Sequence, residues 1–483
     1  MRWIGCLLLL VMFAVAPLTA AAQWGPDVRL TDDPLESVTC FNNARCVAAD
    51  GSTIHVVWHD SRDGNTEIYY KRSTDDGTTW GADTRLTMDA SWSERPALAV
   101  RGSSVHAVWY DGRLGPPRIY YKRSTDGGTS WGPDVCLTPQ TGVGYHPSVA
   151  VCESIVHVAW ADFSAGPQVY YARSLDDGAN WEDARNITPT SPPAGKNLVS
   201  VAAVDDLVHV TWMDSRGGPQ IYYTRSLDRG ATWETDRAIV TVSSQFASLA
   251  VSAAGVHVAY ADFREGEATP RIWYTRSVDQ GATWEAAVPL AETFSSWYPS
   301  IAAAGSRVQA LWLDNRHGDA AEVYAKETSD GGASWQPDAR LTEHASESKE
   351  PSVALSGAYV HAVWHDDRDG NWEIYYKRGH AGGSGVDGRQ APSAAAARLL
   401  LAGPNPSSGE VCFRYGSAAA TPVVLEIYAP SGALVRRFLQ APDSGEILWN
   451  GRDETGRDAP SGVYAARMEV DGTVLTGRLV LLR

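Results

Sequence analysis

The sequence is short of basic residues and of long apolar runs, and each shortage excludes a class of protein. Lys and Arg number 41 against 57 Asp and Glu, which gives a net charge of −16. A nucleic-acid-binding protein needs clustered basic side chains to neutralise phosphates, so we expect no nucleic-acid partner. Beyond the first residues, no segment reaches the roughly 18 uncharged apolar residues of a membrane-spanning helix. The composition, 44% hydrophobic and 20% charged, is that of a globular protein.

The N-terminus has the pattern of a secretory signal peptide. Arg2 provides a positive start, residues 4–16 form a short apolar run, and the alanines at 20–22 form a small-residue cleavage site. We therefore expect residues 1–22 to be removed. The mature protein, from Gln23, is predicted to be exported and either secreted or held at the outer cell surface.

Cysteine is scarce, with six residues in the chain. One lies in the predicted signal peptide, and Cys40 and Cys46 are near enough in sequence to close one short loop. Export permits disulfide bonds, so a bridge between these two is one interpretation and two thiols is the other. The sequence leaves the state of the remaining three open (Cys136, Cys152 and Cys412).

An internal repeat occupies most of the chain. The string IHVVW at 54 recurs, roughly 51 residues apart, as VHAVW at 105, VHVAW at 156, VHVTW at 208, VHVAY at 256, VQALW at 308 and VHAVW at 360. Three further strings recur with it, for example IYYKR at 68, PALAV at 96 and WGPDVRLT at 24. All are short, rich in β-branched or aromatic residues, and bounded by Gly, Asp or Pro, so each predicts a strand.

The order of these strings predicts how the strands close into one structure. The first copy of the WGPDVRLT type precedes every other strand, whereas the last unit, which ends at Arg378, has none. An N-terminal strand that completes the last unit explains both facts and leaves no open sheet edge. We therefore predict an all-β fold, a seven-bladed β-propeller over residues 23–378 closed by its N-terminal strand. An open solenoid is the alternative.

The predicted turn between the third and fourth strands carries the most regular motif, as in STDDGTTW at 73 and SLDRGATW at 226. Its Asp can accept backbone N–H groups, its Gly allows a positive φ, and its Trp can bury a ring against the neighbouring blade. We predict a structural role for the aspartates of its six copies: Asp75, Asp126, Asp176, Asp228, Asp279 and Asp330.

These turns resemble the Asp boxes, or BNR repeats, of sialidase-like β-propellers. The resemblance implies the propeller fold, which serves enzymes and binding proteins alike. One function that it implies is a sialidase-type exo-glycoside hydrolase, which would use three arginines, a Tyr nucleophile with a Glu, and an acid/base Asp. No such catalytic set can be assigned residue by residue here, so the catalytic residues are unknown.

The loop after each second strand is a candidate ligand site on the face opposite the Asp boxes. It reads WHDSRDG at 58 and WLDNR at 312, with Arg two residues after the Asp in all units but the third. Arginines around a channel mouth can bind carboxylates or sulfates. The alternative is that each Asp caps its turn and pairs with an Arg of its own or a neighbouring loop. The candidates are Arg62, Arg113, Arg216, Arg264, Arg316 and Arg368.

Aromatic residues that break the repeat are further candidates. Four of them stand in the loops that enter the first strands, where the repeat needs none: Trp92, Tyr145, Trp297 and Tyr298. Flat rings suit stacking on a sugar or a protein hot spot. Packing against the next blade is the alternative.

The histidines, in contrast, follow the repeat. Six of the twelve occupy one strand position, with Gln309 in the remaining copy: His55, His106, His157, His209, His257 and His361. Because the blades distribute them around the ring, we expect core hydrogen bonding rather than a shared metal site.

We expect neither a cofactor nor a metal site. Calcium is the alternative, because two loops are rich in oxygen ligands, although Asp-Gly-Asn is also ordinary turn chemistry. These loops contain Asp60, Asp63, Asn65 and Glu67, and their counterparts Asp366, Asp369, Asn371 and Glu373.

The tail differs from the repeat. Residues 379–398 are rich in Gly, Ser and Ala and predict a flexible linker, and residues 399–483 alternate strands with Gly-rich turns, as in a small Ig-like β-sandwich. The strings PNP at 404, IYAPSG at 427 and SGVYAARM at 461 resemble the flagellar hook-capping Ig-like domain and the type A sorting domain of type IX secretion. The resemblance implies a Gram-negative cell and the type IX secretion machinery as a partner. A plain adhesive module is the alternative.

Together these features predict an exported or cell-surface propeller protein that binds a glycan or protein ligand outside the cell, without catalysis and as a monomer. A sialidase-type hydrolase and a structural surface-layer component are the alternatives. The ligand itself cannot be read from the sequence.

Overall fold

The computed structural model describes residues 23–40, 45–138, 142–189, 192, 195–263, 269–293, 295–318, 320–380, 398–402, 411–416, 423–429, 433–440, 444–470 and 473–481. Within these ranges every regular element is a β-strand. No helix that is long and apolar enough to cross a membrane occurs among the described residues. The chain divides into two compact units, Met1–Gly385 and Val386–Arg483.

The described part of the first unit forms seven antiparallel sheets, one for each copy of the repeat. Sheet 1 contains β3 (Ser37–Val38), β4 (Val47–Asp50), β5 (Thr53–Asp60), β6 (Glu67–Ser73) and β7 (Thr84–Arg85). Sheet 2 contains β8 (Ser93–Arg101), β9 (Ser104–Asp111), β10 (Arg118–Ser124) and β11 (Val135–Cys136). Sheet 3 contains β12 (Gly144–Cys152), β13 (Ile155–Asp162), β14 (Gln168–Ser174) and β15 (Arg185–Asn186). Sheet 4 contains β16 (Asn197–Val204), β17 (Leu207–Asp214), β18 (Gln220–Ser226) and β19 (Arg237–Val240).

The remaining three sheets repeat the same order. Sheet 5 contains β20 (Ser244–Ser252), β21 (Gly255–Asp262), β22 (Arg271–Ser277) and β23 (Val288–Pro289). Sheet 6 contains β24 (Ser296–Ala304), β25 (Arg307–Asp314), β26 (Glu322–Thr328) and β27 (Ala339–Arg340). Sheet 7 contains β28 (Ser348–Ser356), β29 (Tyr359–Asp366) and β30 (Glu373–His380), joined by β1 (Gln23–Trp24) and β2 (Val28–Arg29).

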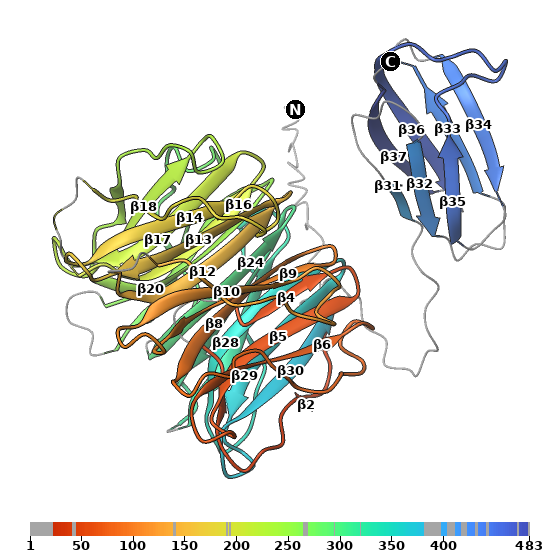
Figure 1. Ribbon diagram of the computed structural model, residues 1–483. Coiled ribbons are helices and arrows are strands. Elements are labelled where there is room, and N and C mark those ends of the chain that lie inside the picture. The colour runs from red at the N-terminus through yellow and green to blue at the C-terminus, as the bar shows by residue number, and fades with distance from the viewer. Residues whose placement is uncertain are drawn as a thin grey trace, which may run out of the picture. The chain divides into compact units, whose positions relative to one another are not determined.

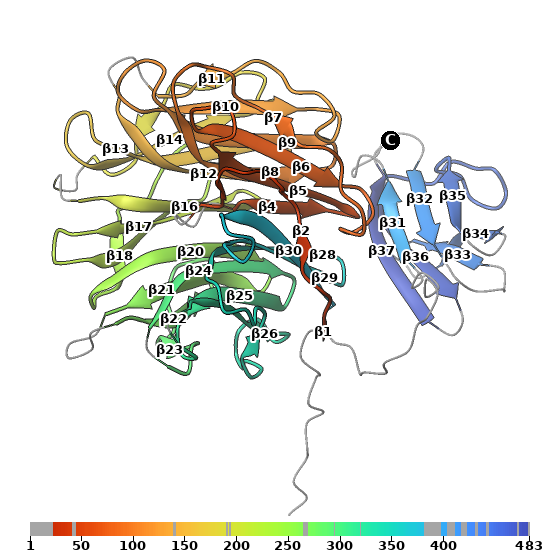
Figure 2. The ribbon, with the colours of Figure 1, turned by 90° about the horizontal axis from the view of Figure 1, so that it is seen from below.

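The inner strands β4, β8, β12, β16, β20, β24 and β28 join the sheets into a ring (Figures 1 and 2). Each inner strand contacts the next, and β28 contacts β4. Serine side chains link neighbours, for example Ser148 Oγ, which accepts the backbone N–H of Val201 at 3.1 Å. The Ser352 hydroxyl closes the ring in the same way, because it accepts the N–H of Cys46 at 3.0 Å.

The N-terminal strands complete the sheet of the last repeat, as the displaced first copy predicts. Gln23 pairs with His380 and Trp24 with Gly379, while Val28 pairs with Tyr376. The two ends of the repeat region are therefore held in one sheet, and the hydrogen bonds between them close the ring.

Buried tryptophans and histidines of the second strands form the core of the sheets. Six Trp are fully buried there: Trp58, Trp109, Trp160, Trp212, Trp312 and Trp364. The six repeat histidines are also buried, and each shares a hydrogen bond with a Tyr of the third strand, as His209 Nδ1 does with the Tyr223 hydroxyl at 2.7 Å. Burial lowers the pKa of His209 to about 3. The prediction of core hydrogen bonding is confirmed.

The six repeated turns lie at the end of the ring opposite to the loops that carry the Asp-Arg pairs. Asp75 accepts hydrogen bonds from Ser73 Oγ at 2.7 Å and from the N–H of Thr79 at 2.8 Å. The Thr79 hydroxyl also donates to Asp75 and has the largest effect on its pKa. Together these hydrogen bonds lower the pKa of Asp75 to about 2. The Trp of each turn packs edge-on against a Tyr of the preceding sheet, as Trp233 does on Tyr171 at 4.8 Å between ring centroids.

The glycine of these turns is required by a close contact as well as by its backbone angle. Gly230 has φ of +81°, and a Cβ built on it would lie 2.0 Å from the Tyr171 hydroxyl. We expect Gly230→Ala to lower the free energy of unfolding by about 3 kcal/mol, from the left-handed conformation and the steric clash together. Gly218 is the matched control, since it has φ of +95° and a Cβ built on it would meet nothing within 4 Å. For Gly218→Ala we expect about 1 kcal/mol in the same urea titration, and equal losses would contradict the role of the contact.

The second unit contains two sheets packed on one apolar core. One sheet has the order β31 (Arg398–Ala402), β32 (Val411–Gly416), β35 (Ser444–Trp449). The other has the order β34 (Leu434–Gln440), β33 (Val423–Tyr428), β36 (Gly462–Val470), β37 (Thr473–Leu481). Side chains of both sheets meet in the core, among them Phe413 and Trp449 from the first and Leu425 and Met468 from the second.

Candidate functional site

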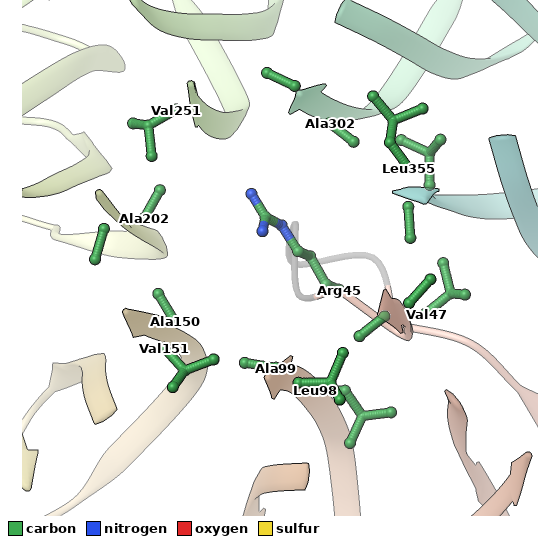
Figure 3. Close-up of a pocket in the computed structure, with 17 residues that line it drawn as sticks. Arg45, Val47, Leu98, Ala99, Ala150, Val151, Ala202, Val251, Ala302 and Leu355 are labelled. Carbon is green, nitrogen blue, oxygen red and sulfur yellow. The ribbon is translucent and has the colours of Figure 1, made fainter. Parts of the chain in front are cut away.

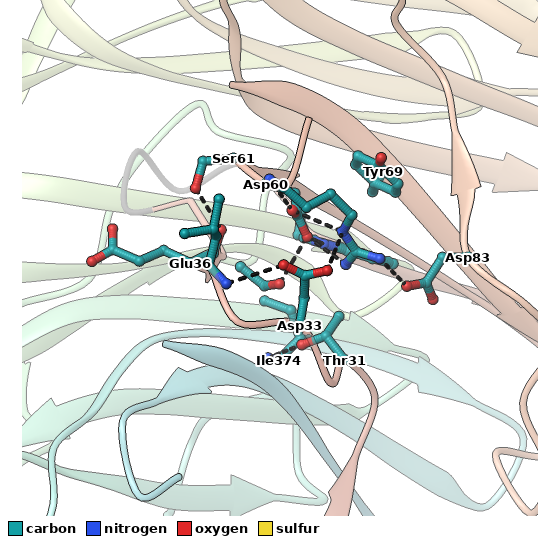
Figure 4. Close-up of polar contacts among 12 residues, drawn as sticks. Thr31, Asp33, Glu36, Asp60, Ser61, Tyr69, Asp83 and Ile374 are labelled. Atoms are coloured by element: carbon teal, nitrogen blue, oxygen red, sulfur yellow. Dashed lines mark hydrogen bonds and ion pairs between the residues drawn. The ribbon is translucent and has the colours of Figure 1, made fainter. Parts of the chain in front are cut away.

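In five of the seven sheets a described Asp-Arg loop forms a brace, and Figure 4 shows that of sheet 1. Asp60 accepts hydrogen bonds from Ser37 Oγ at 2.8 Å, from Trp58 Nε1 at 2.9 Å and from the N–H and Nε of Arg62, both at 2.9 Å. The Arg62 guanidinium also donates to Asp83 at 2.8 Å. Burial alone would raise the pKa of Asp60, but the hydrogen bonds from Arg62 and Trp58 outweigh it and hold the pKa below its ordinary value.

The same brace recurs around the ring, so the loop arginines are not gathered into one site. Each of the five described arginines bonds the Asp of its own loop and a second Asp immediately before an outer strand of its sheet: Arg62, Arg113, Arg216, Arg316 and Arg368. The outer strand of sheet 7 is N-terminal, and its contribution is Asp27. Arg264 lies outside the described residues. In the described loops the arginines therefore pair with aspartates, as the alternative interpretation expects, and do not form a ring that is open to a ligand.

The residues of the alternative calcium site are also engaged by protein groups. Asp63 forms an ion pair with Arg85 at 2.9 Å, and Glu67 forms one with the same Arg85 at 2.8 Å. Asn65 Nδ2 donates to Glu67 at 2.9 Å. Across the described residues, no three or more His, Cys, Asp or Glu side chains are placed to hold a metal ion.

Cys40 and Cys46 are close but not joined by a disulfide bond, so the bridge predicted as one interpretation is not present in the structure. The Cys46 sulfur instead accepts the backbone N–H of Cys40 at 3.3 Å. Burial raises the pKa of the Cys46 thiol well above its ordinary value. Cys46 therefore packs as a small apolar side chain beside the inner strand β4.

The side chains differ from copy to copy at one end of the ring, where the inner strands begin. A β-bulge interrupts the pairing of inner and second strands there, for example between Glu94 and Ala97 in sheet 2. In six sheets the bulge holds a residue other than glycine at positive φ: Arg95, His146, Leu198, Phe246, Tyr298 and Glu350. We call this end of the ring the mouth and these six side chains the mouth residues. Because six sheets share this left-handed conformation, it belongs to the repeat, and the side chain that it carries is what differs from sheet to sheet.

Arg95 is the electrostatic centre of the mouth. Its Nε donates to the Tyr110 hydroxyl at 2.9 Å, and that hydroxyl donates to Glu94 at 3.1 Å. After burial, the charge of Arg95 is the largest influence on the pKa of His146, which falls to about 3. Burial raises the pKa of the Glu350 carboxyl to about 8, and the charge of Arg95 acts in the opposite direction. Groups from several sheets are therefore close enough to interact with one guanidinium.

Two aromatic clusters flank this centre. In sheets 2 and 3, Tyr110 meets both Trp92 and Tyr145 edge-on, each at 5.5 Å between ring centroids. In sheets 5 and 6, Phe263 meets Trp297 at 5.3 Å and Phe246 meets Tyr298 at 4.8 Å. The four aromatic residues singled out in the sequence thus lie in two groups at the mouth, each half-buried.

Trp92 shows how packing and exposure combine in these clusters. A Cβ built on Gly112 would lie 2.5 Å from the Trp92 ring, so this ring packs on the backbone of its own sheet. One face of the ring is therefore used in packing. Part of the Trp92 side chain therefore packs inside the fold, as the alternative interpretation expects, and the rest is exposed at the mouth.

Arg95, Glu350 and Tyr110 were not predicted as site residues from the sequence. A signal for the first two was present, because the residue before the recurring Pro-Ala or Pro-Ser string changes from unit to unit while its neighbours repeat. A variable position inside a strict repeat indicates a residue that the scaffold does not require. That these variable positions lie together at the mouth follows only from the closed ring.

Comparisons with known proteins concern the fold. No model of a known protein family matches the sequence, and no curated protein matches it. Among solved structures, an ulvan lyase is similar with a TM-score of 0.54 at 10% identity, over 74% of this chain and 96% of the lyase. The BP39L lectin from Burkholderia pseudomallei is similar with a TM-score of 0.51 at 12% identity, over 69% of this chain and 96% of the lectin. At such identities the likeness establishes an all-β, propeller-like fold and leaves the activity to be argued from the site.

Proposed function

We propose that this protein is an exported seven-bladed propeller that binds an acidic glycan at its mouth, on the face opposite six Asp-box turns, without cleaving it. The observation that carries the proposal is the break in symmetry at the mouth. The braces and turns repeat around the ring, whereas Arg95 and the two aromatic clusters occur once each. A binding site for one ligand requires such an asymmetry, because a scaffold role would recur in every blade.

The chemistry of the mouth favours a glycan over a protein surface. Aromatic faces stack on sugar rings, and a guanidinium pairs with a carboxylate or sulfate on the same chain. The proteins of similar fold named above include a lectin and a polysaccharide lyase bound in one structure to a chain of glucuronate and sulfated rhamnose. We take the ligand class from this analogy and from the residues of the mouth together.

Delivery to the outside of a Gram-negative cell is part of the proposal. It is supported by the signal-peptide pattern of residues 1–22 and by the tail over 399–483, which resembles the Ig-like sorting domains of type IX secretion. The type IX machinery is then the partner in export. The mature chain is proposed to act as a monomer, secreted or attached to the surface.

The test is a glycan array probed with the purified mature chain. We expect binding to glycans that carry uronate or sulfate and none to their neutral counterparts. The best glycan is then incubated with the protein and analysed by mass spectrometry, where we expect the intact glycan. Shortened or unsaturated products would show an enzyme instead, and an empty array would contradict the ligand class.

A further inference from the structure

A cavity of about 170 Å³ lies inside the ring and is lined by all seven inner strands (Figure 3). The repeat itself creates the space. One inner-strand position is alanine in every sheet: Ala48, Ala99, Ala150, Ala202, Ala250, Ala302 and Ala354. Seven methyl groups around a common axis cannot fill the centre, so a hollow remains.

Arg45 extends into this hollow. It precedes β4 at a position that is Pro, Val or Ala in the other six sheets. Figure 3 shows its guanidinium near the centre of the ring, with Ala202, Val251 and Ala302 on the surrounding strands. Among the described residues that line the cavity, Arg45 alone carries a charge, and the others are Val, Ala and Leu.

Among the described residues, this cation has little compensation. One amino group, Nη2, donates to the backbone carbonyl of Leu249 in β20 at 3.1 Å. No described Asp or Glu forms an ion pair with Arg45, and burial lowers its pKa. An arginine cannot escape the cost of burial by losing its proton, because its pKa stays far above neutral. A half-buried cation with no counter-charge among the described residues bears part of the cost of leaving bulk water, and an anion beside it would offset that cost.

We infer that the cavity holds a small monovalent anion, of the class of chloride or a short carboxylate, paired with Arg45. The volume equals that of about five or six water molecules, enough for one such anion and a few waters. The inner strands are sheet edges, so backbone N–H groups that face the axis can complete the shell of the anion. The bound ion would join sheet 1, through Arg45, to the opposite side of the ring.

Unfolding at constant ionic strength tests the inference, with chloride replacing the bulkier gluconate. In the native chain and in Arg45→Lys, which keeps a cation, we expect stability to rise with the logarithm of chloride concentration. Above the dissociation constant, the ratio of folded to unfolded protein then rises tenfold for every tenfold increase in chloride. In Arg45→Met the chloride dependence is expected to vanish, whatever the stability of that variant in gluconate.

Crystals grown in bromide provide the second measurement. We expect one anomalous peak within ion-pair distance of the Arg45 guanidinium in the native protein and none in the Arg45→Met crystals. A native cavity without the peak, together with no chloride dependence, would overturn the inference. An equal chloride dependence in Arg45→Met would overturn it as well, because the ion would then bind elsewhere. Acetate in place of chloride distinguishes a carboxylate site from a halide site.

Discussion

The free energy of unfolding is expected to fall steeply as the pH is lowered from about 6.5 toward 4. Burial lowers the pKa of His55, His106, His257 and His361 to about 4 and that of His157 and His209 to about 3. In the unfolded chain each regains a pKa near 6.5. Between these values the unfolded state binds more protons than the folded state, so acid favours unfolding, and the stability is fully present above about pH 6.5. Each histidine contributes a slope of about 1.4 kcal/mol per pH unit in that window.

The chain itself offers the variant that tests this effect. In sheet 6 the position is occupied by Gln309, whose Nε2 donates to the carbonyl of Lys326 at 3.1 Å. Burial also lowers the pKa of His59 to about 4 and that of His146 and His365 to about 3, so nine histidines titrate in this window. A triple variant with His106, His157 and His209 each changed to Gln removes three of these nine. Urea titrations between pH 4 and 7.5 should show a slope reduced by about a third, and an unchanged slope would mean that other groups govern the acid response.

Asp111→Ala is expected to lower the free energy of unfolding by about 3–5 kcal/mol, because it breaks a buried charge network. The fully buried Asp111 carboxylate accepts from Ser93 Oγ at 2.9 Å, from Trp109 Nε1 at 3.0 Å and from the Arg113 guanidinium at 2.6–2.9 Å. Its loss leaves these donors without that acceptor. The measurement is urea unfolding at pH 7.5, followed by tryptophan fluorescence.

Sheet 3 supplies the matched control for this prediction. Its loop has Ser164 where the others have Arg, so Asp162 accepts from the backbone N–H of Ser164 at 3.0 Å and from its hydroxyl. The other oxygen of Asp162 is buried without a hydrogen-bond partner in the structure. We expect Asp162→Ala to cost about 1 kcal/mol or less. Equal losses for the two variants would show that the Asp111 network contributes nothing beyond an ordinary loop contact.

The repeat made the ring predictable from sequence. Strand identity followed from short β-branched strings at a fixed period, and the displaced first strand indicated the pairing of Trp24 with Gly379 that the structure contains. The roles of the repeat histidines could be predicted for the same reason, since seven equivalent positions cannot meet in one place. Properties that repeat are set locally, and local sequence is enough to find them.

The candidate site was less predictable because it depends on positions that do not repeat. Trp92 and Trp297 were found as aromatic residues outside the pattern, but their partners Tyr110 and Phe263 belong to other strands and loops. The loop arginines, in contrast, drew attention by their number, although each is held by two aspartates of its own sheet. Arg45 departs from the Pro, Val or Ala of the other six copies, but its environment exists only after seven inner strands enclose it.

Calorimetric titration of the best array glycan tests the central claim, that the mouth binds a glycan. The variants are Trp297→Ala at the mouth and Leu227→Ala, which removes an exposed apolar side chain, 52% accessible, from a turn at the opposite end of the ring. We predict that Trp297→Ala weakens binding about tenfold or more, a loss of about 1.4 kcal/mol, and that Leu227→Ala binds like the native chain. Native affinity in Trp297→Ala, or an equal loss in Leu227→Ala, would contradict the assignment of the mouth as the binding site.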